Sequence, residues 1–226
     1  MTCHSLPPCV SQPIKRGMST SSVLPLASRA LRWVALGVLA VAVAIIALVA
    51  GGAFDPRPCG SLARRDTPGR FALAGRGETF EQQPAPFTGT PSCYGVRLTA
   101  AHATGEMDSG YGLALGDKKA AFVVAVSPLG EVAVWQAAVG ENEPRYLLPW
   151  QPWPHVRPGD APNEIWLDVR RDGERTLVTA RLNRELLWEG KVEALYSDAA
   201  LWLGSFGGSV TVDFDTLDWY VLSEGQ

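Results

Sequence analysis

Acidic residues are missing from the first 53 positions, and histidine and cysteine are scarce throughout, with three and four copies in 226 residues. No two cysteines form a Cys-x-x-Cys motif, and no Cys/His spacing is typical of a zinc site, so we predict neither a metal ion nor a cofactor. Phosphate-binding loops, the GxGxxG fingerprint and the GxSxG nucleophile elbow are absent as well. The sequence therefore lacks the motifs of nucleotide-dependent enzymes and serine hydrolases.

Clusters of basic residues are also absent beyond short pairs such as Arg64-Arg65. The first 53 residues carry a charge of +4, whereas the remainder, with 16 basic and 23 acidic residues, carries −7. Nucleic-acid-binding domains present a basic face to the phosphates. The acidic balance of the larger part argues against a nucleic-acid partner.

No charged residue occurs from Trp33 to Phe54, in the run WVALGVLAVAVAIIALVAGGAF. As a helix this run would extend roughly 33 Å, enough for the ~30 Å hydrocarbon core of a bilayer. We predict a single transmembrane helix within residues 31–54, with 33–54 in contact with lipid. The basic residues that precede it place the N-terminus in the cytoplasm and residues 55–226 outside the plasma membrane.

A cleavable signal peptide is the alternative. Gly51-Gly52-Ala53 offers the small residues of a cleavage site, and a true start at Met18 would shorten the segment before the apolar run. The run, however, exceeds the roughly 7–15 residues of a typical signal core. We therefore favour a retained anchor.

Ser, Pro and Thr are frequent in residues 1–30, which we predict to be a disordered cytoplasmic tail. Residues 55–69 are rich in Gly and Pro and are predicted to be a linker. With this orientation Cys3 and Cys9 lie in the reducing cytoplasm. Cys59 and Cys93 lie outside, where disulfides persist, and we predict a bond between them.

From Tyr94 onward the sequence reads as short strands. In YGVRLTA and NEIWLDVR apolar residues alternate with polar ones, as in half-buried strands. Pro128 and Gly130 in SPLG, and the pair Asn183-Arg184, have the chemistry of hairpin turns. Many short strands with turns between them predict an all-β domain over residues 70–223, an antiparallel sandwich of two sheets.

Three segments resemble bacterial concanavalin A-like (laminin G-like) jelly rolls, including the 3-keto-disaccharide hydrolase group. They are MDSGYGLALGDKKAAFVVAVSPLGEVAVWQ, LLPWQPWPHVRPGDAPNEIWLDVRRDGERTLVTARLNRELLWEG and LWLGSFGGSVTVDFDTLDWYV. The resemblance implies a jelly-roll sandwich. It implies no single activity, because the family includes enzymes, sugar-binding modules and domains without a known ligand. One departure is Arg184, where the family usually has glycine.

Three aspartates, Asp213, Asp215 and Asp218, stand close together in the final strand. Related sandwich endoglucanases carry Glu-x-Asp-x-x-Glu at similar spacing on a bulged strand. A bulge near Thr216 would bring the three carboxylates onto one face and turn Val212, Phe214, Leu217 and Trp219 to the core. A general acid needs a raised pKa, which a wet sheet face does not provide. We interpret the aspartates as a solvated or hydrogen-bonded face, with ligand contact as the alternative, and predict no catalytic residue.

Tryptophans are the other candidate binding residues. Trp135 and Trp166 are out of phase with the core positions of their strands and should face the opposite side. Trp150 and Trp153 occur in the Pro-rich stretch PWQPWPHVRP, predicted to be a loop. Such rings can stack on sugars or pack against loops. The remaining three of interest, Trp188, Trp202 and Trp219, are predicted in the core.

Together these features favour a membrane-anchored extracytoplasmic module without catalytic activity that binds carbohydrate, such as a cell-envelope glycan. One alternative is a glycoside hydrolase of the 3-keto-disaccharide type. Another is a structural or protein-binding ectodomain without a small ligand. Carboxylates clustered beside an aromatic groove would favour the enzyme, exposed tryptophan rings the sugar-binding module, and a filled sheet face the protein-binding domain.

Overall fold

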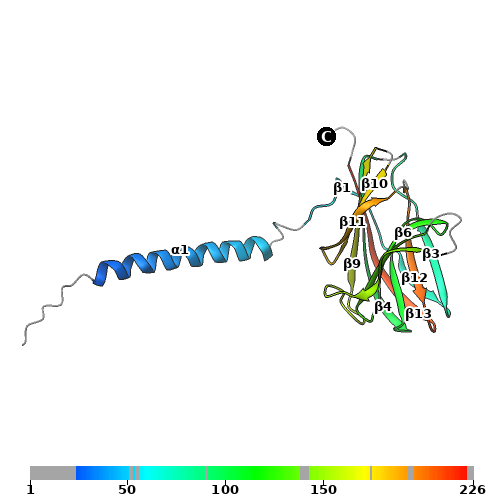
Figure 1. Cartoon of the computed structure of the whole chain (residues 1–226), viewed down its shortest axis with the longest axis horizontal. Coiled ribbons are helices and arrows are strands. Elements are labelled where there is room, and N and C mark those ends of the chain that lie inside the picture. The colour runs from blue at the N-terminus through cyan, green and yellow to red at the C-terminus, as the bar shows by residue number, and fades with distance from the viewer. Residues whose placement is uncertain are drawn as a thin grey trace, which may run out of the picture. The chain divides into compact units, whose positions relative to one another are not determined.

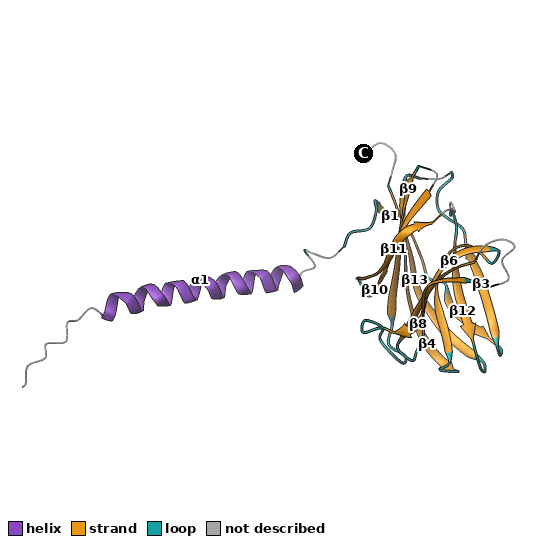
Figure 2. Cartoon of the chain, viewed as in Figure 1, coloured by secondary structure: helices purple, strands orange, loops and turns teal. Residues whose placement is uncertain are grey.

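The computed structural model describes residues 24–50, 53, 56–89, 91–137, 143–173, 175–192 and 196–222. The chain separates into two compact units, one that ends at Asp55 and one that begins at Pro56. The first contains a helix and the second a β-sandwich (Figures 1 and 2). Cys3 and Cys9, and the predicted disorder of residues 1–23, lie outside the described residues.

Helix α1 spans Leu24–Ala50. Its segment Leu31–Ala50 has a mean hydropathy of 2.8 and is long enough to cross a bilayer. Residues 24–30, which we predicted as part of a disordered tail, belong to this helix. A signal sequence can also form an apolar helix near the N-terminus, so the helix is confirmed and its retention in a membrane stays a prediction.

The second unit consists of two layers of antiparallel strands (Figure 1). Sheet A has the order β1 (Ser61–Asp66), β13 (Val210–Val221), β4 (Cys93–Gly105), β9 (Asn163–Asp172), β10 (Arg175–Leu182) and β11 (Glu185–Val192), and β2 (Gly69–Leu73) also pairs with β13. Sheet B has the order β3 (Gly77–Gln83), β12 (Ala199–Ser205), β5 (Ser109–Asp117), β6 (Ala120–Val126), β7 (Glu131–Ala137) and β8 (Arg145–Pro152). The predicted two-sheet sandwich is confirmed.

Alternating apolar side chains from both sheets form the core between them. On β13 the inward set is Val212, Phe214, Leu217 and Trp219, each at most 1% exposed. The inward positions shift from even to odd residue numbers after Phe214, and a β-bulge at Asp215 accounts for this shift. Phe214 pairs with Ala100 and Thr216 pairs with the adjacent Thr99, so Asp215 is the extra residue. Both the inward set and the bulge are as predicted.

Both predicted hairpins are present. Ser127 and Gly130 close the β6–β7 turn, where the Gly130 amide donates to the Ser127 carbonyl at 3.0 Å. The β10–β11 turn has positive φ at both central residues, 50° at Asn183 and 76° at Arg184. Asn tolerates this left-handed conformation, whereas the second position of such a turn usually takes glycine. Arg184 therefore occupies a position that is unfavourable for its backbone.

Two segments differ from the sequence prediction. The stretch predicted as linker, residues 55–69, contains β1, and the stretch predicted as a Trp-rich loop overlaps the end of β8, so that Trp150 lies in a strand. β1 has little apolar alternation, so period-2 patterning does not reveal it. β1 pairs with the C-terminal half of β13 and β2 pairs with the N-terminal half, so both short strands are positioned by the same edge of β13.

The predicted disulfide joins Cys59 to Cys93, with Cα atoms 6.0 Å apart and a sequence separation of 34 residues. Replacing both cysteines with serine should lower the free energy of unfolding of a fragment of residues 56–226 by roughly 3–4 kcal/mol, because the unfolded chain regains loop entropy. Urea unfolding of the oxidised fragment and the double variant measures this loss. An unchanged midpoint would contradict a stabilising role for the bond.

Replacing Arg184 with glycine should stabilise the same fragment by about 1 kcal/mol, since glycine adopts positive φ without the Cβ clash. Replacing Arg175 with glycine, within regular strand β10, is the control and should destabilise. Thermal unfolding followed by circular dichroism would show the two variants shifting in opposite directions. A lower melting temperature for Arg184→Gly would contradict the argument.

Candidate functional site

The three aspartates of β13 occupy three different environments. Asp213 accepts two hydrogen bonds from the Arg70 guanidinium, at 2.6 and 2.8 Å. These hydrogen bonds lower the pKa of the Asp213 carboxyl. Asp215 is exposed in the bulge, and Asp218 is only 2% exposed. The structure therefore does not bring them together as an open carboxylate cluster.

Asp218 lies at the centre of a charged network on the outer face of sheet A. Arg65 donates to both of its oxygens, at 2.6 and 2.8 Å, and Arg97 donates to Oδ2 at 2.7 Å. Burial would raise the pKa of Asp218, but the hydrogen bonds and charges of the two arginines outweigh it and the pKa is lowered. An ionised carboxylate held between two guanidinium groups is a structural ion cluster.

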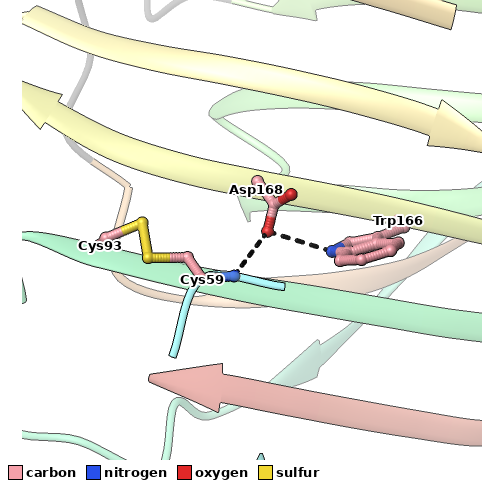
Figure 3. Close-up of a disulfide and its surroundings, with 4 residues drawn as sticks. All are labelled: Cys59, Cys93, Trp166 and Asp168. Atoms are coloured by element: carbon pink, nitrogen blue, oxygen red, sulfur yellow. Dashed lines mark hydrogen bonds between the residues drawn. A yellow bond between two sulfur atoms is a disulfide. The ribbon is translucent and has the colours of Figure 1, made fainter. Parts of the chain in front are cut away.

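Asp168 lies on the same face, next to the disulfide (Figure 3). Its Oδ1 accepts hydrogen bonds from the Cys59 amide at 3.3 Å and from Trp166 Nε1 at 3.1 Å. Burial raises the pKa of Asp168, which is the shift that a general acid needs. Its Oδ1 is nevertheless occupied by the protein and the residue is only 7% exposed, which is a poor position for a general acid.

Trp166, a candidate for sugar stacking, does face away from the core as predicted. It is only 3% exposed, however, and its ring lies 6.5 Å from that of Tyr220. Trp153 packs against the sandwich core. Neither ring joins the aromatic residues of the other sheet.

The outer face of sheet B carries a second apolar cluster. Small residues line it, and the indoles of Trp135 and Trp202 are packed with them, their ring centroids 5.0 Å apart. Glycine at position 110 leaves room for Trp202 and for the neighbouring Trp150, since a Cβ there would approach Trp202 Cζ3 to 3.0 Å and Trp150 Cη2 to 2.8 Å. The sheet face is therefore filled by the protein's own rings.

Trp202 corrects one prediction. It was expected in the core between the sheets, but it lies in this outer cluster, where its Nε1 donates to Glu78 at 3.0 Å. Trp219 is in the core as predicted, and Trp188 is half-buried against it. In LWLGS the residues Leu201 and Leu203 face the core, so period-2 alternation places Trp202 on the opposite side.

A pocket of about 250 Å³ opens beside this outer cluster. Its lining combines two carboxylates, two serines and two aromatic rings, contributed by Asp108, Ser109, Ser127, Glu131, Trp150 and Phe206. Trp150 meets Phe206 edge to face, with centroids 6.2 Å apart, and lies 6.3 Å from Trp135. Of the sequence candidates, this pocket contains Trp150 alone.

The loops around the pocket are fixed to each other by hydrogen bonds. The Phe206 amide donates to the Asp108 carbonyl at 3.0 Å, and Ser109 Oγ donates to the Glu106 carbonyl at 2.6 Å. Ser127 Oγ accepts from the Leu129 amide at 3.2 Å. The backbone around the pocket and its two serines are therefore held in place before any ligand binds.

Sequence reasoning missed five of the six lining residues of this pocket. They lie at the ends of strands or just beyond them, in loops that the chain connectivity separates and the fold brings together. The sequence predicted the SPLG turn, but the alternation of apolar residues along strands does not predict which loop lies opposite that turn. Trp150 was the single signal that pointed to the site.

No protein-family model matches the sequence, and no curated protein matches it. Several solved structures are similar to the chain. The carbohydrate-binding module CBM66 from Bacillus subtilis has 13% identity and a TM-score of 0.41, with 71% of this chain and 91% of that chain covered. Sheep galectin-11 has 14% identity and a TM-score of 0.40, with 65% and 98% covered.

An endo-1,3-β-glucanase from Streptomyces sioyaensis has 10% identity and a TM-score of 0.49, with 72% of this chain and 79% of that chain covered. At these identities and TM-scores, the similarities leave the functional argument to the residues of the site. The narrower resemblance to the 3-keto-disaccharide hydrolase group stays a prediction.

Asp218 and Asp213 allow a matched test on one strand. Asp218→Asn should destabilise a fragment of residues 56–226 by about 2–3 kcal/mol, somewhat less than the loss of a fully enclosed ion pair, because Arg65 is half exposed. Asp213→Asn, whose ion pair is solvated, should leave the urea midpoint nearly unchanged. Equal effects of the two substitutions would contradict this assignment.

The pH dependence follows from the lowered pKa of Asp218. Its contribution to stability is complete above about pH 4, the ordinary value for aspartate, and is lost as the pH falls through the lowered pKa. Asp218→Asn should therefore narrow the difference in stability between pH 6 and pH 2. Urea titrations at both pH values measure that difference for the wild type and the variant.

Proposed function

We propose that this chain is a membrane-anchored, extracytoplasmic module that binds glycans without hydrolysing them. The observation that supports it best is the pocket beside Trp150 and Phe206. Aromatic rings offer apolar faces to the C–H groups of a sugar, and carboxylates and serine hydroxyls form hydrogen bonds with its hydroxyl groups. The pocket combines these groups in a space suited to one or two sugar units.

The apolar helix supports the anchoring part of the proposal. It is long enough to span a bilayer, the sequence before Trp33 has four basic and no acidic residues, and the next unit contains a disulfide. An N-terminus in the cytoplasm and a sandwich outside the cell agree with all three features. Such an arrangement would present the pocket to glycans of the envelope or of the surroundings.

The charged groups of sheet A argue against catalysis there. Asp218 is ion-paired with two arginines and Asp168 is covered by Cys59 and Trp166. Asp108 and Glu131 are the carboxylates of the pocket, and they are the residues that a hydrolase reading would have to use. Product formation that depends on either of them is therefore the outcome that decides between binding and hydrolysis.

A protein-binding ectodomain is the second candidate. The observation in its favour is the outer face of sheet B, which is filled by Trp135, Trp202 and their small neighbours rather than open to a sugar chain. Tyr146 and Phe206 at its border are about half exposed. The absence of glycan binding by the full chain would favour this candidate.

A glycan array probed with the full chain in non-ionic detergent tests the proposal. Phe206→Ala should weaken binding of the best glycan about tenfold, which corresponds to a loss of roughly 1–2 kcal/mol of ring contact. Tyr146→Ala is the matched control, because this ring is equally exposed but lies outside the pocket. Its binding should equal that of the wild type.

The proposal fails if no glycan binds, or if Phe206→Ala and Tyr146→Ala weaken binding equally. Sugar release by the wild type that disappears in Glu131→Gln would replace it with the hydrolase. Retention of the uncleaved chain in cell membranes, with the C-terminal unit accessible to external protease, tests the anchor separately. A soluble product that begins near Phe54 would show a signal peptide instead.

A further inference from the structure

A second cavity, of about 400 Å³, opens on the outer face of sheet A. Its residues come from two strands, a loop and a turn, and they are Thr99, Arg157, Pro162, Glu164, Asn183 and Arg184. Thr99 of β4 and Glu164 of β9 form its floor, where they are register partners. None of these residues lines the pocket beside Trp150, and the two cavities are on different sheets.

Two asparagines hold the walls of this cavity in place. The Asn183 side chain accepts from the Glu164 amide at 2.8 Å and donates to the His155 carbonyl at 2.6 Å. Asn163 accepts from the Arg157 amide at 2.8 Å and from the Asn183 Nδ2 at 2.8 Å. The β10–β11 turn and the loop that carries Arg157 are thus bound to one another, and both arginines are carried by backbone of defined position.

Arg184 stands where the turn prefers glycine, with φ of 76°. A residue kept in an unfavourable backbone conformation is a reason to look for a role of its side chain. Here that side chain is a guanidinium on the border of a cavity that already has a second guanidinium, Arg157. Arg157 is exposed, and its Nη1 donates to the Pro162 carbonyl at 3.1 Å, which orients the group.

The charges of the cavity are arranged unevenly. Glu164 on the floor lies 3.8 Å from Arg97, so its charge is partly balanced from the side of the sheet. Arg157 and Arg184 are on the walls. A ligand with an anionic group at one end and hydroxyls at the other would match this arrangement, since guanidinium groups bind carboxylates in paired hydrogen bonds.

We propose that this cavity binds a carboxylate-bearing saccharide, that is, a sugar acid, through Arg157 and Arg184. The carboxylate of the sugar pairs with the two guanidinium groups, and Thr99 and Glu164 on the floor form hydrogen bonds with its hydroxyls. The site does not rest on the glycan-binding pocket proposed above, because the two share no lining residue. A chain with both sites would distinguish acidic from neutral saccharides.

Titration calorimetry of the full chain in non-ionic detergent tests this with trigalacturonate and its methyl ester, which lacks the charge. The wild type should bind the acid and not the ester. Arg184→Gly and Arg157→Gln should each weaken binding of the acid at least tenfold. Arg184→Gly should fold at least as well as the wild type, so its loss of binding cannot come from unfolding.

Arg145→Gln is the matched control, because Arg145 is an exposed arginine on sheet B and the change in net charge is the same. It should leave the affinity for trigalacturonate unchanged, as should Phe206→Ala in the pocket beside Trp150. If Phe206→Ala loses binding on the glycan array but still binds trigalacturonate, the result supports this inference and shows that the pocket beside Trp150 is a separate site.

Three results would overturn the inference. Equal weakening by Arg145→Gln and Arg184→Gly would reduce the effect to overall charge. Equal binding of the methyl ester would remove the carboxylate from recognition. Displacement of trigalacturonate by an equal concentration of inorganic phosphate would make the cavity a simple anion site rather than a saccharide site.

Discussion

The ion pairs of the buried Asp218 carboxylate attach β1, the first strand of the sandwich, to the rest of sheet A. Arg65 on β1 and Arg97 on β4 both donate to it, so one ionised group connects three strands of sheet A. β1 buries few apolar side chains and could not dock on hydrophobic burial alone. Charge pairing, main-chain hydrogen bonds and the nearby disulfide hold the first segment of the second unit, residues 59–66, against the rest of the sandwich.

A different constraint shapes the opposite sheet. Alanine and glycine on the outward positions of β5, β6, β7 and β12 leave room for large rings to lie against the sheet. Trp135 and Trp202 fill that room, and Trp150, which contacts Trp135, continues the row of rings toward the loops. The broad sheet face is therefore closed, and space for a ligand remains at its border, where strands end and loops meet.

The two cavities have opposite chemistry as a result of where they lie. The one on sheet B combines aromatic rings with carboxylates and hydroxyls, and the one on sheet A combines two arginines with a threonine and a glutamate. Both are built mainly from residues in loops or at strand ends, which a rigid sandwich positions. The sandwich supplies the same support to each, and their side chains alone make them different.

Many short alternating strands with turns between them predicted the sandwich. Alternation along VTVDFDTLDWYV predicted the inward residues of the final strand and its bulge, because a strand has a strict two-residue period that burial enforces. Cysteine placement and turn residues likewise predicted the disulfide and both hairpins. Period-2 patterns do not say which outward residues are covered by another segment. Only the tertiary structure decided that Trp166 and Asp218 are enclosed, that Trp202 packs against Trp135 and that Phe206 meets Trp150, because those contacts join residues far apart in the chain.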